Sequence, residues 1–288
     1  MELSTSINVL FDIRDVLKVE HMIERLAGVG FKVLDFNFCD WIFEDSPFVT
    51  NGWEKWIKNA KKAADDLGVR FSQSHGPIFD KFSDSELGRT NTLLSHRSIE
   101  ASAILGAKWV VFEPGHYCHD GSGNEKGRNL EWFGGILKTA EKVTVGIAIE
   151  NITDYFSNKH ITCRSYGSTP SELIDLTDTF NHPLIGICWD TGHANLQRVD
   201  QRKALGIIGN RLKVVHIQDN DRSSDQHLLP YCGNVNWKEI IDTLYEIGFK
   251  GDFTYEVASF TRSMPDSFRD IALRYAFALG QAMLQMHF

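Results

Sequence analysis

The stretch I-G-I-C-W-D-T-G at residues 185–192 decides the fold of this 288-residue chain. A short run of mostly apolar residues leads directly into an aspartate, a threonine and a glycine. Such a run, closed by turn residues, is typical of a buried strand in a parallel sheet. Asp190 then stands at the carboxyl end of the strand, which is where parallel α/β folds build their sites.

Three other stretches follow the same pattern: each is an apolar run that carries one side chain able to bind a metal ion. They read G-I-A-I-E-N at 146–151, K-V-V-H-I-Q-D at 213–219 and D-F-T-Y-E-V at 252–257. Together with the first stretch they supply, in chain order, Glu150, Asp190, His216 and Glu256. We therefore expect these four side chains to lie together at one end of a sheet.

Predicted strands and helices alternate along the chain at the repeat of an eight-stranded α/β barrel. The strands are expected at 7–11, 31–36, 69–74, 109–112, 146–149, 185–189, 213–217 and 253–255. The helices are expected at 19–27, 53–67, 91–105, 130–142, 202–208, 237–247 and 267–286, with another that begins near 169–172. The fold class is therefore α/β, a single (β/α)8 TIM barrel over residues 1–288, since barrels of this length form one domain.

The composition suggests a large core and a cytoplasmic setting. Hydrophobic residues make up 42% of the chain, and the formal net charge of −8 at pH 7 argues against nucleic acid as a partner. The five cysteines are scattered without a C-x-x-C pair, as expected of reduced thiols. The first residues lack a signal-peptide pattern, and no apolar run approaches the roughly 20 residues that span a bilayer. We expect a cytoplasmic protein that does not contact a membrane.

Three carboxylates and one imidazole form an oxygen-rich set that suits one divalent cation. Such a set favours Mn²⁺ or Mg²⁺, tolerates Co²⁺ and accepts Zn²⁺ less selectively. A single carboxylate at a strand end often only caps a helix or pairs with a lysine. Three clustered carboxylates, however, would repel one another and raise one another's pKa unless a cation lay among them.

The chain resembles the xylose isomerase-like TIM barrel superfamily, which contains sugar phosphate isomerases and epimerases. The matching stretches are A-I-E-N at 148–151, C-W-D-T-G-H-A at 188–194, V-V-H-I-Q-D-N at 214–220 and Y-E-V at 255–257. The resemblance to ketose 3-epimerases of this group implies that one metal ion is bound by Glu150, Asp190, His216 and Glu256. It also implies that Glu150 and Glu256 exchange the substrate proton.

The same resemblance implies residues that bind a sugar or polyol. His193, three residues after Asp190, and Arg222, six residues after His216, match positions that contact substrate oxygens. Those epimerases carry a second glutamate six residues after the first, where this chain has Phe156. The ends of predicted strands three and four add three residues expected to line the pocket: His75, Glu113 and His116.

A site of this kind supports proton transfer beside a carbonyl. A hydroxyketone or hydroxyaldehyde would chelate the cation, which stabilises the enediolate formed when the adjacent carbon loses its proton. One glutamate would take that proton, and another group would return one to the opposite face or to the neighbouring carbon. Arg222 would fix substrate oxygens or a phosphate, or would remain an exposed loop arginine.

Other activities use related sites. Dehydratases of cyclic keto-polyols, of the inosose or dehydroshikimate type, share the metal set and also begin with proton abstraction. The superfamily also contains trinuclear zinc endonucleases that cut at apurinic sites, and His75, His193, Asp225 and His227 resemble part of their ligand set. Asp225 and His227 are therefore candidates for an additional metal ion or for contacts to the first ligands. A carbohydrate-binding barrel without catalysis is a further alternative, but binding alone needs no paired bases.

Three further segments carry predictions. The stretch D-Q-H-L-L-P-Y-C-G-N-V-N-W at 225–237 resembles a loop of sugar isomerase-like proteins, with Tyr231 where that loop usually has glycine. The aromatic segment 37–52 either packs on the barrel rim or closes over a sugar ring. A stripe at helical spacing near the carboxyl terminus predicts a core-facing helix, or else a contact in a homo-oligomer: Phe268, Ile271, Tyr275 and Leu279.

Overall fold

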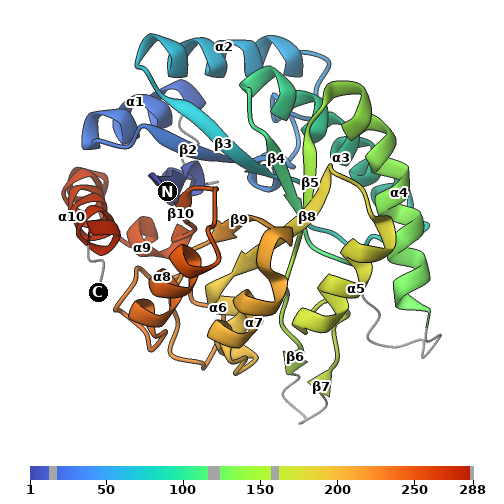
Figure 1. The fold of residues 1–288 in the computed structure, drawn as a ribbon. Helices are drawn as coiled ribbons and strands as arrows, with labels where there is room; N and C mark the ends of the chain where they lie inside the picture. The colour runs from blue at the N-terminus through green and yellow to red at the C-terminus, as the bar shows by residue number, and fades with distance from the viewer. Residues whose placement is uncertain (13–17, 116–123, 157–161, 286–288) are drawn as a thin grey trace.

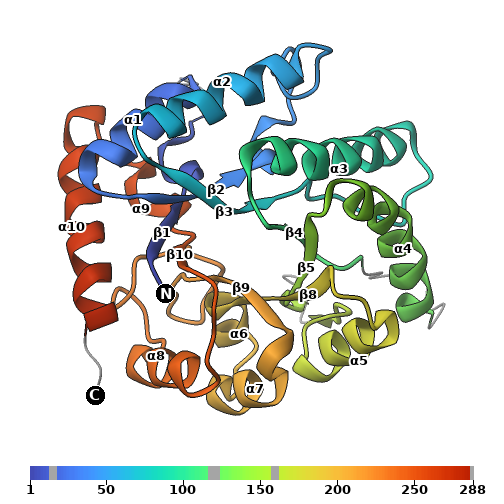
Figure 2. The same cartoon turned by 45° about the horizontal axis from the view of Figure 1, so that its top comes forward.

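The computed structural model describes residues 1–12, 18–115, 124–156 and 162–285. Eight parallel strands form one sheet in the order β10-β1-β2-β3-β4-β5-β8-β9. A parallel bridge between Ile217 and Tyr255 joins the two ends of this order, so the sheet curls into a nearly closed barrel. Helices are ringed around the strands (Figures 1 and 2). The predicted TIM barrel is confirmed.

The strands and helices alternate as predicted. The barrel strands are β1 (Leu3–Ser6), β2 (Val33–Asn37), β3 (Arg70–His75), β4 (Trp109–Phe112), β5 (Gly146–Glu150), β8 (Ile185–Asp190), β9 (Leu212–His216) and β10 (Phe253–Tyr255). The helices are α1 (Val19–Val29), α2 (Trp53–Asp66), α3 (Glu86–Leu105), α4 (Glu125–Val143), α5 (Pro170–Phe180), α6 (Thr191–Leu196), α7 (Gln201–Ile208), α8 (Trp237–Glu246), α9 (Ala258–Arg262) and α10 (Asp266–Gln285). A short antiparallel pair, β6 (Tyr155–Phe156) and β7 (Thr162–Cys163), lies outside the barrel.

The predicted first strand at 7–11 is wrong. The strand is β1, and residues Ile7–Leu10 form a 3-10 helix whose first turn is capped by the side chain of Ser6. Leu3 and Ser4 pair with Phe253 and Thr254 of β10. The sequence L-S-T-S of β1 is fully buried but mostly polar, so it lacks the apolar run on which the prediction relied.

Strand register places the four predicted ligands at one rim of the barrel. Glu150 pairs with Cys188, and Asp190 pairs with His216, across neighbouring parallel strands. Glu256 follows β10 directly, and its backbone amide donates to the carbonyl of Ile217 at 3.0 Å. Because parallel strands all end at the same side of the barrel, side chains far apart in the sequence converge there.

Helix α10 does not bury the predicted apolar stripe. Phe268, Ile271 and Tyr275 are 56%, 59% and 59% exposed, and Leu279 is only partly buried. The face that packs on the barrel is instead Leu273, Ala276, Gly280 and Met283. Small residues on that face let the helix approach closely: a Cβ built on Gly280 would lie 2.5 Å from Leu3 Cδ1 and 2.7 Å from the Tyr255 hydroxyl.

The aromatic segment 37–52 packs within the protein. Phe38 and Phe48 are fully buried and stacked, with ring centroids 4.9 Å apart, and Trp41 packs beside Trp56 at 4.8 Å. These rings therefore form part of the core between the rim and α2.

Within the described residues, no helix combines the length and the apolar character that crossing a membrane requires.

The close approach of α10 predicts opposite effects for two glycine substitutions. Gly280→Ala should lower the free energy of unfolding by about 1–3 kcal/mol, because the added methyl overpacks a buried contact. Gly135→Ala, in α4, should raise it by about 0.5–1 kcal/mol, since nothing lies within 4 Å of the added Cβ. Urea denaturation of both variants tests this; equal effects would contradict the packing of α10.

Candidate metal centre

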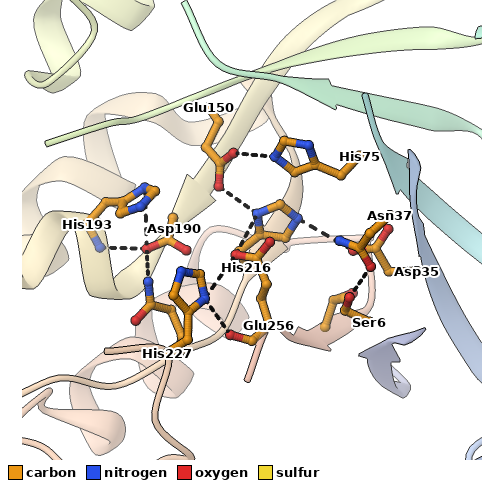
Figure 3. A network of polar contacts seen from close by, with 12 residues as sticks. Ser6, Asp35, Asn37, His75, Glu150, Asp190, His193, His216, His227 and Glu256 are labelled. Atoms are coloured by element: carbon orange, nitrogen blue, oxygen red, sulfur yellow. Dashed lines mark hydrogen bonds and ion pairs between the residues drawn. The ribbon is translucent and has the colours of Figure 1, made fainter. Parts of the chain in front are cut away.

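Four side chains converge at the carboxyl end of β5, β8, β9 and β10. The candidate ligand atoms of Glu150, Asp190, His216 and Glu256 all lie within 4.8 Å of one another, and all four residues are buried. His216 Nδ1 lies 2.5 Å from Glu150 Oε1 and 3.5 Å from Glu256 Oε2. Figure 3 shows the carboxylates turned toward the imidazole ring. The sequence prediction placed these four side chains together, and the structure brings them together.

Asn151 holds the backbone of the aspartate in place. The side-chain nitrogen of Asn151 donates to the backbone carbonyl of Asp190 at 2.9 Å. The side-chain oxygen of Asn151 accepts from the backbone N–H of Asp190 at 2.7 Å. Asp190 also caps α6, because its Oδ1 accepts from the His193 amide at 2.5 Å. The other oxygen, Oδ2, is buried with no hydrogen-bond partner among the described residues. An unpartnered buried carboxylate oxygen is what a bound cation would satisfy.

Burial and mutual repulsion set the charges of the cluster. Burial and, to a smaller extent, the nearby charges of Glu150 and Asp190 raise the pKa of Glu256 to about 7, against the opposing effects of His216 and His227. Burial also raises the pKa of Asp190. The pKa of Glu150 is well below its usual value, because the imidazoles of His216 and His75 outweigh burial.

The imidazoles carry the compensating charge. Burial acts to lower the pKa of His216, but Cys188, Glu256 and Glu150 around the ring raise it well above its usual value. Without a cation, a charged imidazole therefore stands among the carboxylates. A divalent cation bound there would take over this role and displace protons from the ligands.

A second cluster adjoins the first at the rim. His227 Nε2 lies 2.9 Å and His193 Nε2 lies 3.4 Å from Asp225 Oδ2. Each imidazole also donates from Nδ1 to a backbone carbonyl, His227 to Glu256 at 3.0 Å and His193 to Asn151 at 2.8 Å. The three ligand atoms lie within 4.8 Å of one another. The charges within this cluster are therefore already paired with one another. Against the effect of burial, the hydrogen bonds and charges of His193 and His227 hold the pKa of Asp225 far below its usual range.

The other predicted substrate residues are placed differently. His75 Nε2 lies 3.2 Å from Glu150 Oε2, and Glu113 offers an oxygen within 4.8 Å of the same pair. Arg222 is exposed, and its Nε donates to the side chain of Asn195 at 3.0 Å. His116 lies outside the described residues.

Two residues near this end of the barrel were missed from the sequence. Asp35, in β2, is fully buried, and its Oδ2 lies 3.7 Å from His216 Nε2. Lys81 is 7% exposed, with Nζ 5.2 Å and 5.3 Å from the ring centroids of Phe79 and Trp132. Burial lowers the pKa of Lys81 to about 8, against the nearby charge of Glu113. The charge inside the otherwise apolar V-L-D-F of β2 was the available signal for Asp35.

The loop from 219 to 237 is organised by one buried carboxylate. Asp219 accepts hydrogen bonds from the amides of Tyr231 and Val235 and from the indole of Trp237. Tyr231 has φ +70°, the left-handed conformation that glycine adopts most easily. The backbone turn therefore takes a glycine-like form although a tyrosine stands there.

Comparison with known proteins gives a family and several relatives. The family model described as xylose isomerase-like TIM barrel matches residues 23–274. An uncharacterized protein of Methanocaldococcus jannaschii is 28% identical over 243 residues, covering 81% of this chain and 79% of the relative. The D-psicose 3-epimerase of Ruminiclostridium cellulolyticum is 22% identical over 246 residues, covering 82% and 77%. The crystal structure of a D-tagatose 3-epimerase-like protein has the same fold, with a TM-score of 0.78, 21% identity, and coverage of 99% of this chain and 98% of the other.

The raised pKa of Glu256 predicts a pH-dependent cost in the metal-free protein. As pH rises from 4.5 to about 7, the unfolded glutamate ionises while the folded one stays protonated, so this group lowers stability across that window. The shift corresponds to on the order of 3 kcal/mol, fully present above pH 7. In EDTA, Glu256→Gln should therefore be more stable than the parent by that order at pH 8 and nearly equal to it at pH 4.5.

Urea denaturation across pH 4.5–8 measures this difference. The exposed Glu131→Gln in α4 is the matched control and should show no such trend. A difference between Glu256→Gln and the parent that stays constant with pH would show that Glu256 ionises normally.

Proposed function

The chain belongs to the xylose isomerase-like TIM barrel family, and from this premise we propose that it is a divalent-metal-dependent sugar isomerase or epimerase. Its substrate would be a small sugar or polyol, with or without a phosphate. The observation that carries the proposal is the pair of buried glutamates, Glu150 and Glu256, that lie beside His216 Nδ1 at the carboxyl end of the barrel. Relatives that are named as sugar epimerases support it.

We assign one divalent cation, Mn²⁺ or Mg²⁺, to Glu150, Asp190, His216 and Glu256. Three carboxylates make the set oxygen-rich, which favours these ions over softer metals. The unpartnered Asp190 Oδ2 and the raised pKa of Glu256 are both features that a cation would relieve. When bound, the cation would polarise the sugar carbonyl and stabilise negative charge on it.

The two glutamates would move the proton. A general base must stand within hydrogen-bond reach of the proton that it takes, and both glutamates are buried at the carboxyl end of the barrel beside His216. Glu150 is ionised and hydrogen-bonded by two imidazoles, His75 and His216. One glutamate takes the proton from the carbon beside the carbonyl. Return of a proton to the opposite face gives an epimer, and return to the neighbouring carbon gives an isomer.

The rim residues would bind the rest of the sugar. His193 donates from Nδ1 to Asn151, which fixes its ring and directs Nε2 toward Asp225 and the rim. His75 and Glu113 lie beside Glu150, where they can contact substrate hydroxyls. Arg222 is held by Asn195 near the same rim, and its exposed guanidinium can contact substrate oxygens or a phosphate.

One observation favours a second candidate function. The cluster of His193, Asp225 and His227 has the residue types of an additional metal site, which would suit a multi-zinc phosphodiesterase. Both nitrogens of His227 already donate hydrogen bonds, however, to Glu256 O and to Asp225 Oδ2. An ion there would have to displace a proton from an imidazole whose pKa is raised to about 9 by Asp225 and Glu256 against the effect of burial. The first cluster is the stronger site because it has three carboxylates, one of them with an unpartnered oxygen, whereas the second cluster has one carboxylate.

Turnover should depend on both glutamates. With Mn²⁺ in deuterated water, the parent should exchange the substrate C–H and form an isomer or epimer from one of a panel of ketoses, aldoses, their phosphates and inososes. Glu150→Gln and Glu256→Gln should each lose about 10²–10⁴-fold in turnover, because each removes a positioned base. Proton NMR follows both exchange and product, and Glu131→Gln is the control.

Three results would count against this prediction. A double Gln variant at near the parental rate would remove the proton-transfer mechanism. Loss of water from an inosose would place the chain among the dehydratases, which share the first step. If no sugar or polyol shows exchange or product, and the protein cleaves an oligonucleotide with an apurinic site, the phosphodiesterase would be favoured.

Metal content should separate the two clusters. After chelation and reloading, elemental analysis should find one Mn²⁺ per parent chain, and none in Asp190→Asn or His216→Gln. Asp225→Asn should leave the count at one, because its cluster is outside the assigned set. Two or three ions per chain, reduced by Asp225→Asn, would instead support the multi-zinc alternative.

A further inference from the structure

Asp35 is a buried carboxylate that the proposed proton transfer does not use. It lies inside the barrel on β2, with 0% of its surface exposed. Within the described ranges, neither of its oxygens accepts a hydrogen bond that meets ordinary geometry. A buried carboxyl group without a hydrogen bond is costly, so its presence at this place points to a role.

The side chain that faces Asp35 is the imidazole of His216. Asp35 Oδ2 lies 3.7 Å from His216 Nε2, and this nitrogen also lacks a hydrogen-bond partner in the described part of the chain. The other nitrogen, Nδ1, faces Glu150 and Glu256. Figure 3 shows Asp35 on the opposite side of the ring from the glutamates. Among the described residues, Asp35 belongs to none of the groups that could ligate a metal ion, so it stands behind a ligand and is not one itself.

We propose that Asp35 is a positioning residue for His216, a role that rests on the cation site of the proposed function. A histidine binds a metal ion through a nitrogen without a proton, so the ring must carry its proton on the other nitrogen. With Nδ1 turned to the ligand cluster, Nε2–H needs an acceptor, and the Asp35 carboxylate is the group in place. A short movement would bring His216 Nε2 and Asp35 Oδ2, now 3.7 Å apart, to hydrogen-bond distance. The hydrogen bond would fix the tautomer and the orientation of the ring and make Nδ1 a stronger ligand.

The barrel interior keeps Asp35 in line with the ring. Asp35 pairs in register with Gln73 of β3. The Gln73 side chain is itself fixed, because its oxygen accepts from the Thr254 hydroxyl at 3.2 Å. Its amide nitrogen is buried and has no acceptor within the residues that the structure describes. Polar side chains of β2, β3 and β10 thus fill the space beneath the candidate metal centre, which explains why a carboxylate is tolerated there.

The test measures Mn²⁺ affinity by isothermal titration for the parent, Asp35→Ala, Asp35→Asn and Ser4→Ala. Asp35→Ala should weaken binding about 10–100-fold, the effect typical of removing such a partner. Asp35→Asn keeps an acceptor oxygen and should recover much of that loss. Ser4→Ala is the matched control: it removes another fully buried polar group without a partner, on β1, and should leave affinity unchanged.

A second readout distinguishes positioning from general destabilisation. In protein labelled with ¹⁵N-histidine and loaded with Zn²⁺ as a diamagnetic probe, His216 should carry its proton on Nε2, with a strongly downfield proton signal. In Asp35→Asn this signal should move upfield, and in Asp35→Ala it should be lost to exchange. A merely structural role would lower the melting temperature while leaving the affinity and the signal in place, and that outcome would overturn the proposal.

The parent measurement separates the two claims. If the parent binds no Mn²⁺, the assigned cation site fails and the positioning role falls with it. If the parent binds Mn²⁺ and both Asp35 variants bind it equally well, only the positioning role is wrong.

Discussion

Burying several carboxylates together is the constraint on which the rest of this structure depends. Glu150, Asp190 and Glu256 are almost fully removed from water within a few ångströms of one another. Like charges at such a distance repel strongly where the local dielectric is low. The fold can hold all three in the ionised form only if positive charge stands among them. His216 provides part of it in the metal-free protein, and a divalent cation would provide the rest.

The same constraint gives the two glutamates different properties. Glu150 receives hydrogen bonds from two imidazoles and stays ionised, whereas the pKa of Glu256 is raised to about 7 by burial and by its neighbours. In the metal-free protein, Glu256 is therefore the glutamate of the pair that changes its charge near neutral pH. The second cluster around Asp225 is paired internally, which leaves the first cluster as the one in need of a cation.

The sequence predicted what local pattern determines and missed what long-range packing determines. The barrel and the four convergent side chains follow from apolar runs and from the rule that parallel strands end at one rim. The first strand was placed wrongly because β1 is buried yet polar, as Ser4 and Ser6 show. The stripe of Phe268, Ile271 and Tyr275 was assigned to the core, but Gly280 gives α10 a closer fit on its other face. Asp35 could not be linked to His216, since only the closed barrel brings the side chain of Asp35 on β2 to the imidazole ring of His216 on β9.

The most direct test of this account is anomalous diffraction from a crystal of the chelated protein soaked in Mn²⁺. We expect one anomalous peak, lying between the carboxylates of Glu150, Asp190 and Glu256 and within coordination distance of His216 Nδ1. A peak confined to the cluster of His193, Asp225 and His227, or a site on His216 Nε2 with Asp35 as a ligand, would contradict it. The absence of any peak at this end of the barrel, at saturating Mn²⁺, would contradict it as well.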